Sequence, residues 1–243
     1  MPIPDYSKLC DKKTHKVNHA PYFPKDIACI IAGRRGCGKT NLLLSFLLEE
    51  DILDYTSVYI YCPSLNQSKY QYLQKYYSEL EEKIKTYCRI DVKIGHFFYN
   101  DDEIKDPSEL NANLNHVMVF DDVLLKDQTK IKEYFCRGRH NNVNIFYLCQ
   151  SLHQVAKHCI RDNANVFILF YQDVKTLKYF HETHISGDMD DFKEFKDFCG
   201  NAWSKKHGFV MINMCEEPYC GRYVANCKDI YVPKKYIKIH KNT

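Results

Sequence analysis

Short runs of apolar residues alternate along the chain with longer segments in which apolar positions recur at helical spacing. The runs predict buried strands at Ile27–Ala32, Ser57–Tyr61, His116–Phe120, Val143–Cys149 and Asn165–Tyr171. The amphipathic segments between them predict helices at Asn41–Glu50, Ser64–Cys88, Lys126–Arg137 and Leu152–Arg161. Strands that alternate with helices in this way indicate an α/β fold with a central, mostly parallel sheet flanked by helices.

The remaining segments predict one insertion and a less regular second half. Val92–Tyr99 predicts an additional edge strand, and Asp101–Asn115 predicts a loop with a short helix. After the last buried strand we expect two helices and then a few late antiparallel strands, at Val174–Thr183, Asp190–Cys199, Gly208–Met214 and Arg222–Ala225. We therefore divide the chain into an N-terminal arm (residues 1–24), an α/β domain (25–227) and a basic C-terminal tail (228–243).

Composition adds few constraints. Hydrophobic residues make up 45% of the 243 positions, which is enough for a real core. The net charge of +3 neither requires nor excludes a nucleic-acid partner, and the lysine-rich tail either contacts nucleic acid or only keeps the chain end soluble. Scattered cysteines and the lack of an apolar signal segment before Lys25 favour a reducing compartment. No apolar run approaches the roughly 18 residues of a membrane span, so we expect none.

A phosphate-binding motif follows the first predicted strand. It fits the pattern G-x-x-x-x-G-K-[ST] and consists of Gly33, Arg34, Arg35, Gly36, Cys37, Gly38, Lys39 and Thr40, with Asn41 next in the chain. The glycines let backbone N–H groups approach a polyphosphate, and the following helix points its N-terminus at the anion. Lys39 can reach the β- and γ-phosphates, and the Thr40 hydroxyl can bind Mg²⁺. The sequence therefore predicts a nucleoside triphosphate site with ATP and Mg²⁺ bound by these residues.

A pair of carboxylates ends the third predicted strand. Asp121 and Asp122 follow four apolar residues, and a parallel sheet would bring them to the edge where the phosphate loop lies. Asp121 would hold Mg²⁺, and Asp122 would orient the attacking water. The alternative is a strand end with two solvated acids, but the order and spacing after Lys39 favour the catalytic interpretation.

Gln150 ends the next predicted strand, where its amide can sense the γ-phosphate or the water. Arg137 and Arg139 precede that strand, and Arg161 precedes the following one. An arginine on the flank of one subunit can reach the nucleotide of a neighbour and stabilise charge in the transition state. The alternative for each arginine is a surface salt bridge. The sequence leaves open which of the three acts in this way.

Three stretches between Phe120 and Phe170 carry a family resemblance: FDD, CRGRHNNVNIFYLCQS and IRDNANVFILF. Their order and spacing resemble the FtsK–HerA superfamily of DNA-translocating ATPases, and within it the poxvirus-type genome-packaging ATPases of large DNA viruses, virophages and polinton-like elements. The resemblance implies a RecA-like P-loop NTPase fold in which the strand ending at Gln150 lies between the phosphate-loop strand and the Asp-pair strand. One departure is Asp122, because many superfamily members carry glutamate there.

The resemblance also implies a mechanism and partners. By this likeness Gln150 is the sensor glutamine and Arg139 the trans-acting arginine, which join Lys39, Asp121 and Asp122 in catalysis. The implied assembly is a homo-oligomeric ring, a hexamer or a pentamer, that pumps double-stranded DNA into a preformed capsid and meets capsid proteins at a packaging vertex. Its implied location is the cytoplasm of an infected host cell, in the viral factory, with the virion as a second location. Pore-facing loops would grip DNA; the candidates are Lys126, Lys130 and Lys132.

Other classes of phosphate-loop protein fit the sequence less well. A small-molecule kinase needs an arginine-bearing lid, whose composition we do not find, and gives no reason for Gln150 at a strand end. A GTPase needs Asn-Lys-x-Asp, whereas Asn226–Asp229 reads in another order. A nucleotide-dependent scaffold without catalysis would tolerate the loss of Asp122 and Arg139, and here both positions are filled. A helicase or replication ATPase of the same superfamily remains the main alternative.

Overall fold

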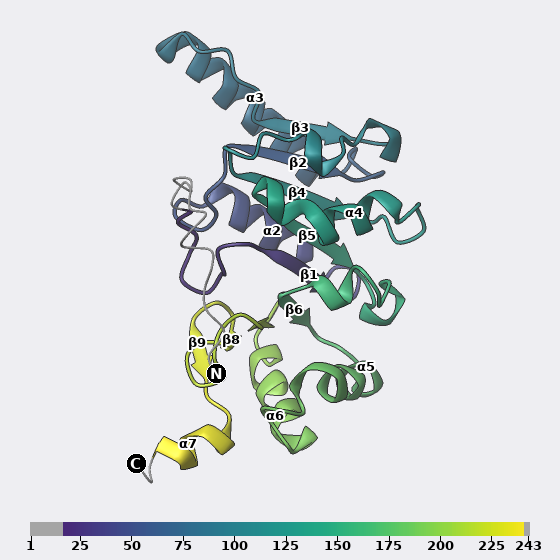
Figure 1. Cartoon of the computed structure of the whole chain (residues 1–243), viewed down its shortest axis with the longest axis vertical. Helices are drawn as coiled ribbons and strands as arrows, with labels where there is room; N and C mark the ends of the chain where they lie inside the picture. Colours follow the sequence, from purple (N-terminus) through teal and green to yellow (C-terminus); the bar gives the residue numbers. More distant parts are fainter. Residues whose placement is uncertain (1–16, 241–243) are drawn as a thin grey trace, which may run out of the picture.

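The computed structural model describes residues 17–240, which contain a single nine-stranded sheet with helices on both faces (Figure 1). The strands lie in the order β3-β2-β4-β5-β1-β6-β7-β8-β9. Their bounds are β1 (Ala28–Ala32), β2 (Ser57–Tyr61), β3 (Gly95–Phe98), β4 (His116–Asp121), β5 (Val143–Cys149), β6 (Val166–Phe170), β7 (Phe209–Asn213), β8 (Tyr223–Ala225) and β9 (Asp229–Tyr231).

The sheet is parallel from β3 to β6 and antiparallel from β6 to β9. This arrangement confirms the predicted fold class, with its central parallel sheet and late antiparallel strands. The strand β5 lies between β1 and β4, as the family resemblance implied. Because parallel strands all end at the same edge, the residues that follow β1, β4 and β5 come together there.

Six helices accompany the sheet in the described part of the chain: α2 (Lys39–Leu48), α3 (Ser68–Cys88), α4 (Thr129–Arg137), α5 (Val174–Phe180), α6 (Phe192–Trp203) and α7 (Lys234–His240). None of these helices has the length and apolar composition needed to cross a membrane. The first two pack on one face of the sheet and α4, α5 and α6 on the other, and each face has its own apolar core. Alternate residues of β1 serve the two cores, because neighbouring side chains of a strand point to opposite faces.

The helix predicted over Leu152–Arg161 is wrong. The chain there forms only short 3-10 turns, at Leu152–Gln154 and Arg161–Asn163, with an irregular segment between them. Cys159 has a left-handed backbone, with a φ of 71°, which a continuous α-helix excludes. Leu152, Val155 and Ile160 are buried nevertheless, so their spacing in the sequence imitated a helix face.

Other boundaries also differ from the prediction. The helix expected to end at Thr183 changes at His181 into a π-helical turn, His181–Ile185. Segment 101–115 holds 3-10 turns at Asp101–Glu103 and Pro107–Glu109. Of the predicted N-terminal arm, residues 1–16 lie outside the described part, whereas Ala20 and Phe23 are buried in the α2 and α3 core.

The predicted tail begins at residue 228, but β9 lies beyond that point and pairs with β8. The sheet therefore continues into the segment that the sequence analysis treated as a tail.

Two asparagines hold the start of β1 in register with its neighbours. The Ile27 N–H donates to Asn144 Oδ1 on β5 (2.9 Å), and the Ala28 N–H donates to Asn165 Oδ1 (2.8 Å). Asn165 Nδ2 also donates to the Asp26 carbonyl at 2.7 Å. Because β1 leads directly into the phosphate loop, these bonds also fix where that loop begins.

We expect Asn144→Ala to lower the free energy of unfolding by about 1–3 kcal/mol, because it leaves the Ile27 N–H buried without its acceptor. Urea unfolding followed by circular dichroism measures the change. Asn201→Ala, at an exposed position of α6, is the control and should stay within about 0.5 kcal/mol of the wild type. Equal effects of the two substitutions would contradict the assigned role.

Candidate functional site

The phosphate loop leaves β1 in a conformation that depends on its glycines. Gly36 and Gly38 have positive φ angles, 78° and 118°, where other residues are strained. Gly33 donates its N–H to the Cys149 carbonyl at the end of β5 (3.1 Å). A side chain on Gly33 would place its Cβ 2.7 Å from Phe170 Cβ, so only glycine fits. The loop is thus built against both strands that flank β1.

Lys39 is folded across the loop at the start of α2. Its Nζ donates to the Gly33 carbonyl (2.6 Å) and to the Arg34 carbonyl (3.2 Å). Gly38 supplies the N-cap of α2 without a side-chain hydrogen bond, and the first turn holds no acidic residue. The first N–H groups of this ten-residue helix are therefore open to an anion, and the helix dipole favours negative charge at that place.

Asp121 is the last residue of β4 and is partly buried. Burial raises the pKa of its carboxyl group, while the hydrogen bond from the Tyr70 hydroxyl and the nearby Lys39 ammonium oppose that rise. Tyr70 is itself fully buried on α3, so it holds the Asp121 carboxylate from the sheet face opposite α4. A partly buried carboxylate near a lysine of the phosphate loop can accept a cation that accompanies a polyphosphate.

Asp122 turns away from the strand. Its φ is 56°, in the left-handed region, and its side chain is exposed. Its Oδ2 lies 3.5 Å from the Ser64 hydroxyl, which follows β2. Gln150 directly follows β5 and is also exposed. Two exposed polar side chains thus lie at the ends of adjacent strands, β4 and β5, beside the partly buried Asp121.

Thr40 is partly exposed on the first turn of α2, directly after Lys39. Its hydroxyl and the Asp121 carboxylate are both oxygen donors, the kind that Mg²⁺ prefers. Asp121 is close enough to Lys39 for the ammonium to influence its pKa, so the acid and the phosphate loop share one site. These residues fit a magnesium-bound triphosphate by the chemistry of their donors.

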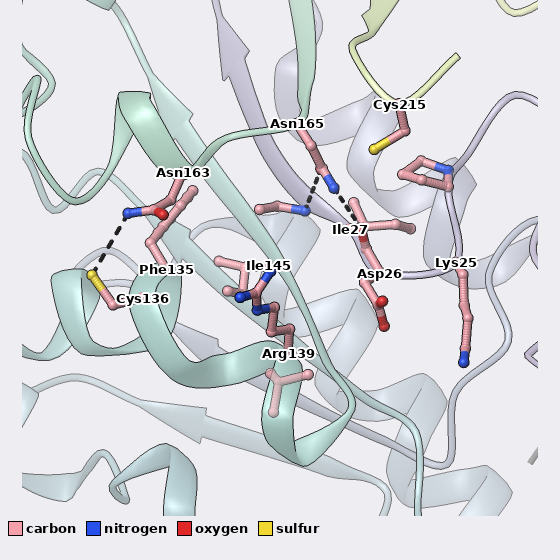
Figure 2. Close-up of a pocket in the computed structure, with 13 residues that line it drawn as sticks. Lys25, Asp26, Ile27, Phe135, Cys136, Arg139, Ile145, Asn163, Asn165 and Cys215 are labelled. Carbon is pink, nitrogen blue, oxygen red and sulfur yellow. Dashed lines mark hydrogen bonds between the residues drawn. The ribbon is translucent and has the colours of Figure 1, made fainter. Parts of the chain in front are cut away.

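Arg139 lies at the other end of the parallel strands, beside the first residues of β1 and β5. It is exposed on the turn Gly138–Asn141 and lines a pocket of about 530 Å³ at the start of β1 and β5 (Figure 2). The five residues of β1 separate this pocket from the phosphate loop, which is about 16 Å at the usual rise of a strand. Arg139 therefore does not join the phosphate site of its own chain.

The other two candidate arginines are engaged within the chain. Arg137 Nη2 lies 3.2 Å from Asp106 Oδ2 and 3.6 Å from Glu133 Oε1. Arg161 is buried, donates from Nη1 to the Tyr179 hydroxyl (2.9 Å) and lies over the Tyr179 ring. Both side chains are therefore held by groups of their own chain.

Two residues at or next to the site, Tyr70 and Gln172, were not predicted. Tyr70 belongs to the apolar stripe of α3, and only its hydroxyl contact with Asp121 reveals a second role. Gln172 follows β6, is buried, and donates from Nε2 to the carbonyls of Ala32 (3.2 Å) and Phe170 (3.0 Å). An amide directly after an apolar strand was a usable signal, the same one that pointed to Gln150.

A glycine-dependent loop on β1, a lysine at the start of α2 and an acid on β4 define a phosphate-loop NTPase. A family model, the poxvirus A32 protein, matches residues 16–217, and the chain belongs to this family. The resemblance to the poxvirus-type branch is therefore confirmed. No curated protein sequence matches the chain.

Solved structures of similar fold include two viral packaging proteins. The genome packaging NTPase B204 of Sulfolobus turreted icosahedral virus 2, in complex with sulfate, has a TM-score of 0.55 and 13% identity, covering 84% of this chain and 96% of that chain. The same protein in complex with AMPPCP has a TM-score of 0.53 and 13% identity, and the match covers 84% of this chain and 98% of that chain. B204 from Sulfolobus turreted icosahedral virus, described as a DNA-packaging ATPase, has a TM-score of 0.51 and 17% identity, over 83% and 97%. At these identities the similarity establishes the fold.

We expect Tyr70→Phe to slow ATP hydrolysis by about tenfold or more without changing the KM for ATP, because the Asp121 carboxylate loses its positioning hydrogen bond. Steady-state kinetics of the purified variant measure both constants.

Tyr77→Phe is the matched control for this prediction. Tyr77 is also buried on α3, and its hydroxyl bonds to the Tyr55 hydroxyl at 2.7 Å, away from the site. Both variants should lose similar stability, and only Tyr70→Phe should lose rate. A similar kcat for the two variants would show that the Tyr70 hydroxyl is structural only.

Proposed function

We propose that this chain is an ATPase that translocates double-stranded DNA and packages a viral genome into a preformed capsid. The observation that carries the proposal is the meeting of Lys39, Asp121 and Asp122 at one edge of the sheet, with Gln150 beside them. Membership of the poxvirus A32 protein family and a fold shared with viral packaging NTPases support the choice of substrate and cargo.

Binding of the triphosphate falls to the phosphate loop. Lys39 would exchange its contacts with the Gly33 and Arg34 carbonyls for contacts with the phosphates, and the N–H groups of the loop and of α2 would hold the remaining oxygens. Thr40 and Asp121 would hold Mg²⁺, which neutralises charge on the β- and γ-phosphates when bound. Tyr70 keeps the Asp121 carboxylate in place for that purpose.

Hydrolysis requires a water molecule to attack the γ-phosphorus while the bond to the β-phosphate oxygen breaks. Asp122, exposed beside Asp121, would orient this water and accept its proton. Gln150 at the end of β5 would report the loss of the γ-phosphate, because its backbone neighbour Cys149 holds Gly33 of the phosphate loop. A shift at that strand end would pass to the loops beyond β4 and β5.

Completion of the site requires a second subunit. Arg139 is exposed at the edge of the sheet opposite its own phosphate loop, so it can serve only the nucleotide of a neighbour. Contacts between opposite edges of identical subunits are head-to-tail and close into a ring when the rotation allows. This geometry supports a homo-oligomeric ring, a hexamer or a pentamer, with ATP bound between subunits.

DNA would be gripped through its backbone, since a packaging motor must accept any sequence. Lys126 and Lys132 are exposed, and Lys130 is partly exposed, in and after the loop that follows β4. Leu125 at the tip of that loop is 98% exposed. We propose that this loop faces the DNA. The further partners would be capsid proteins at a packaging vertex. The location would be the viral factory of the infected cell, or the virion.

We expect purified protein to hydrolyse ATP and double-stranded DNA to raise the rate several-fold. Lys39→Ala should abolish hydrolysis with and without DNA, because the phosphates lose their fixed cation. A phosphate-release assay with linear duplex DNA of mixed sequence measures both effects. Hydrolysis that ignores DNA would argue against a translocase and favour a self-contained kinase or scaffold.

Arg139→Ala should lower hydrolysis by about 10³-fold in the homogeneous variant, in the range known for trans-acting arginines. In an equal mixture with Lys39→Ala protein, which is also inactive alone, hydrolysis should return in part, because subunits that keep Lys39 can receive Arg139 from Lys39→Ala neighbours. Arg137→Ala, whose guanidinium already pairs with Asp106, is the control and should hydrolyse ATP on its own at a rate near that of the wild type. A mixture of Arg139→Ala and Lys39→Ala that stays inactive would overturn the shared site.

A further inference from the structure

An aromatic cluster lies beside the phosphate loop on the side away from the two aspartates. It consists of Tyr171, which follows β6, Trp203 at the end of α6, and His207 in the loop before β7. We refer to these three residues as the aromatic platform. Nothing in the hydrolysis mechanism uses them, yet two of them contact the loop.

The platform is attached to the phosphate loop at two points. His207 Nδ1 lies 2.9 Å from the Cys37 carbonyl, in the middle of the loop. The Arg34 guanidinium carbon lies 5.4 Å from the centroid of the Tyr171 ring. Both contacts join residues of the loop to residues far along the chain, so the platform forms a wall of the same site.

Tyr171 presents its ring at the surface, and Trp203 supports it. The Tyr171 side chain is 54% exposed, although it follows a fully buried strand. The centroids of the Tyr171 and Trp203 rings lie 5.4 Å apart, and the planes of the two rings meet at 60°. Trp203 Nε1 donates to the Leu169 carbonyl (2.9 Å), and this bond fixes the indole. The Arg34 guanidinium lies over the Tyr171 ring, so a group of this size fits over the face of the ring.

The direction of the nucleotide follows from the order of the strands. Asp121 and Asp122 at the end of β4, with Gln150 at the end of β5, mark where the terminal phosphate must lie, on one side of β1. The nucleoside end must then leave the loop on the other side of β1. That side is formed by β6 and β7, where Tyr171 and His207 lie.

We propose that Tyr171 and His207, with Trp203 behind them, form the subsite for the base of a purine nucleoside triphosphate. This inference rests on the proposed function, because it extends the same phosphate site. A purine offers a larger face than a pyrimidine to an exposed aromatic ring. Stacking on an aromatic side chain contributes substantially to the binding of a base.

The experiment separates base binding from phosphate binding. Isothermal titration compares ATP with inorganic tripolyphosphate, which carries the phosphates and no base, on wild type, Tyr171→Ala and Tyr171→Phe. Tyr99→Ala is the matched control, because Tyr99 also follows a parallel strand, β3, and is 44% exposed, but it lies at the far edge of the sheet.

We expect Tyr171→Ala to weaken ATP binding by about tenfold to a hundredfold and to leave tripolyphosphate binding unchanged. Tyr171→Phe should bind ATP like the wild type, and so should Tyr99→Ala. Trp203 is the single tryptophan of the chain, so its fluorescence should respond to ATP and not to tripolyphosphate. Wild-type affinity should also be higher for ATP and GTP than for CTP.

Failure of the inference differs from failure of the proposed function. If ATP binding depends on Lys39 but Tyr171→Ala binds ATP as the wild type does, the base subsite is overturned and the ATPase stands. Equal weakening of ATP and tripolyphosphate also overturns it, because the ring would then only support the loop. If wild-type protein does not bind ATP, or Lys39→Ala binds it equally well, both proposals fail.

Discussion

The site depends on how β1 is held between its two neighbours. Asn144 and Asn165 fix its first residues, and the bond from Gly33 to the Cys149 carbonyl fixes its last. The phosphate loop is therefore not an isolated turn. It is the continuation of a strand whose register is set on both sides, and Phe170 on β6 leaves room at Gly33 for hydrogen only. A nucleotide would meet a loop that the sheet has already shaped.

The two ends of the parallel strands carry different functional groups. The carboxyl edge gathers the phosphate loop, the aspartates and Gln150, whereas the amino edge presents Arg139 beside a pocket. A single chain cannot bring the two edges together, because β1 spans the distance between them. A site that combines Arg139 with the phosphate loop would therefore need two copies of the chain, as the proposed ring provides.

Much of the fold was predictable because its strands are apolar runs that end at recognisable polar residues. The strand before the phosphate loop and the strand that ends at Asp121 were predicted in this way, and the family resemblance supplied the place of β5. The helix predicted between Leu152 and Arg161 was wrong. The apolar residues of this segment have helical spacing, but the left-handed backbone of Cys159 is incompatible with a helix. Tyr70 could not be assigned from sequence, because a buried hydroxyl looks like part of the core until its partner is known. β9 was missed because it is only three residues long and lies in a lysine-rich segment.

The partly buried carboxylate of Asp121 has a consequence for how the protein responds to a bound cation. Burial opposes its charge, and one neutral hydroxyl and a lysine only partly relieve this. A cation that reaches the carboxylate interacts with it in surroundings of low polarity, where attraction is strong. A cation bound at this carboxylate would therefore offset the cost of burying its charge, so occupancy of the site would stabilise the end of β4.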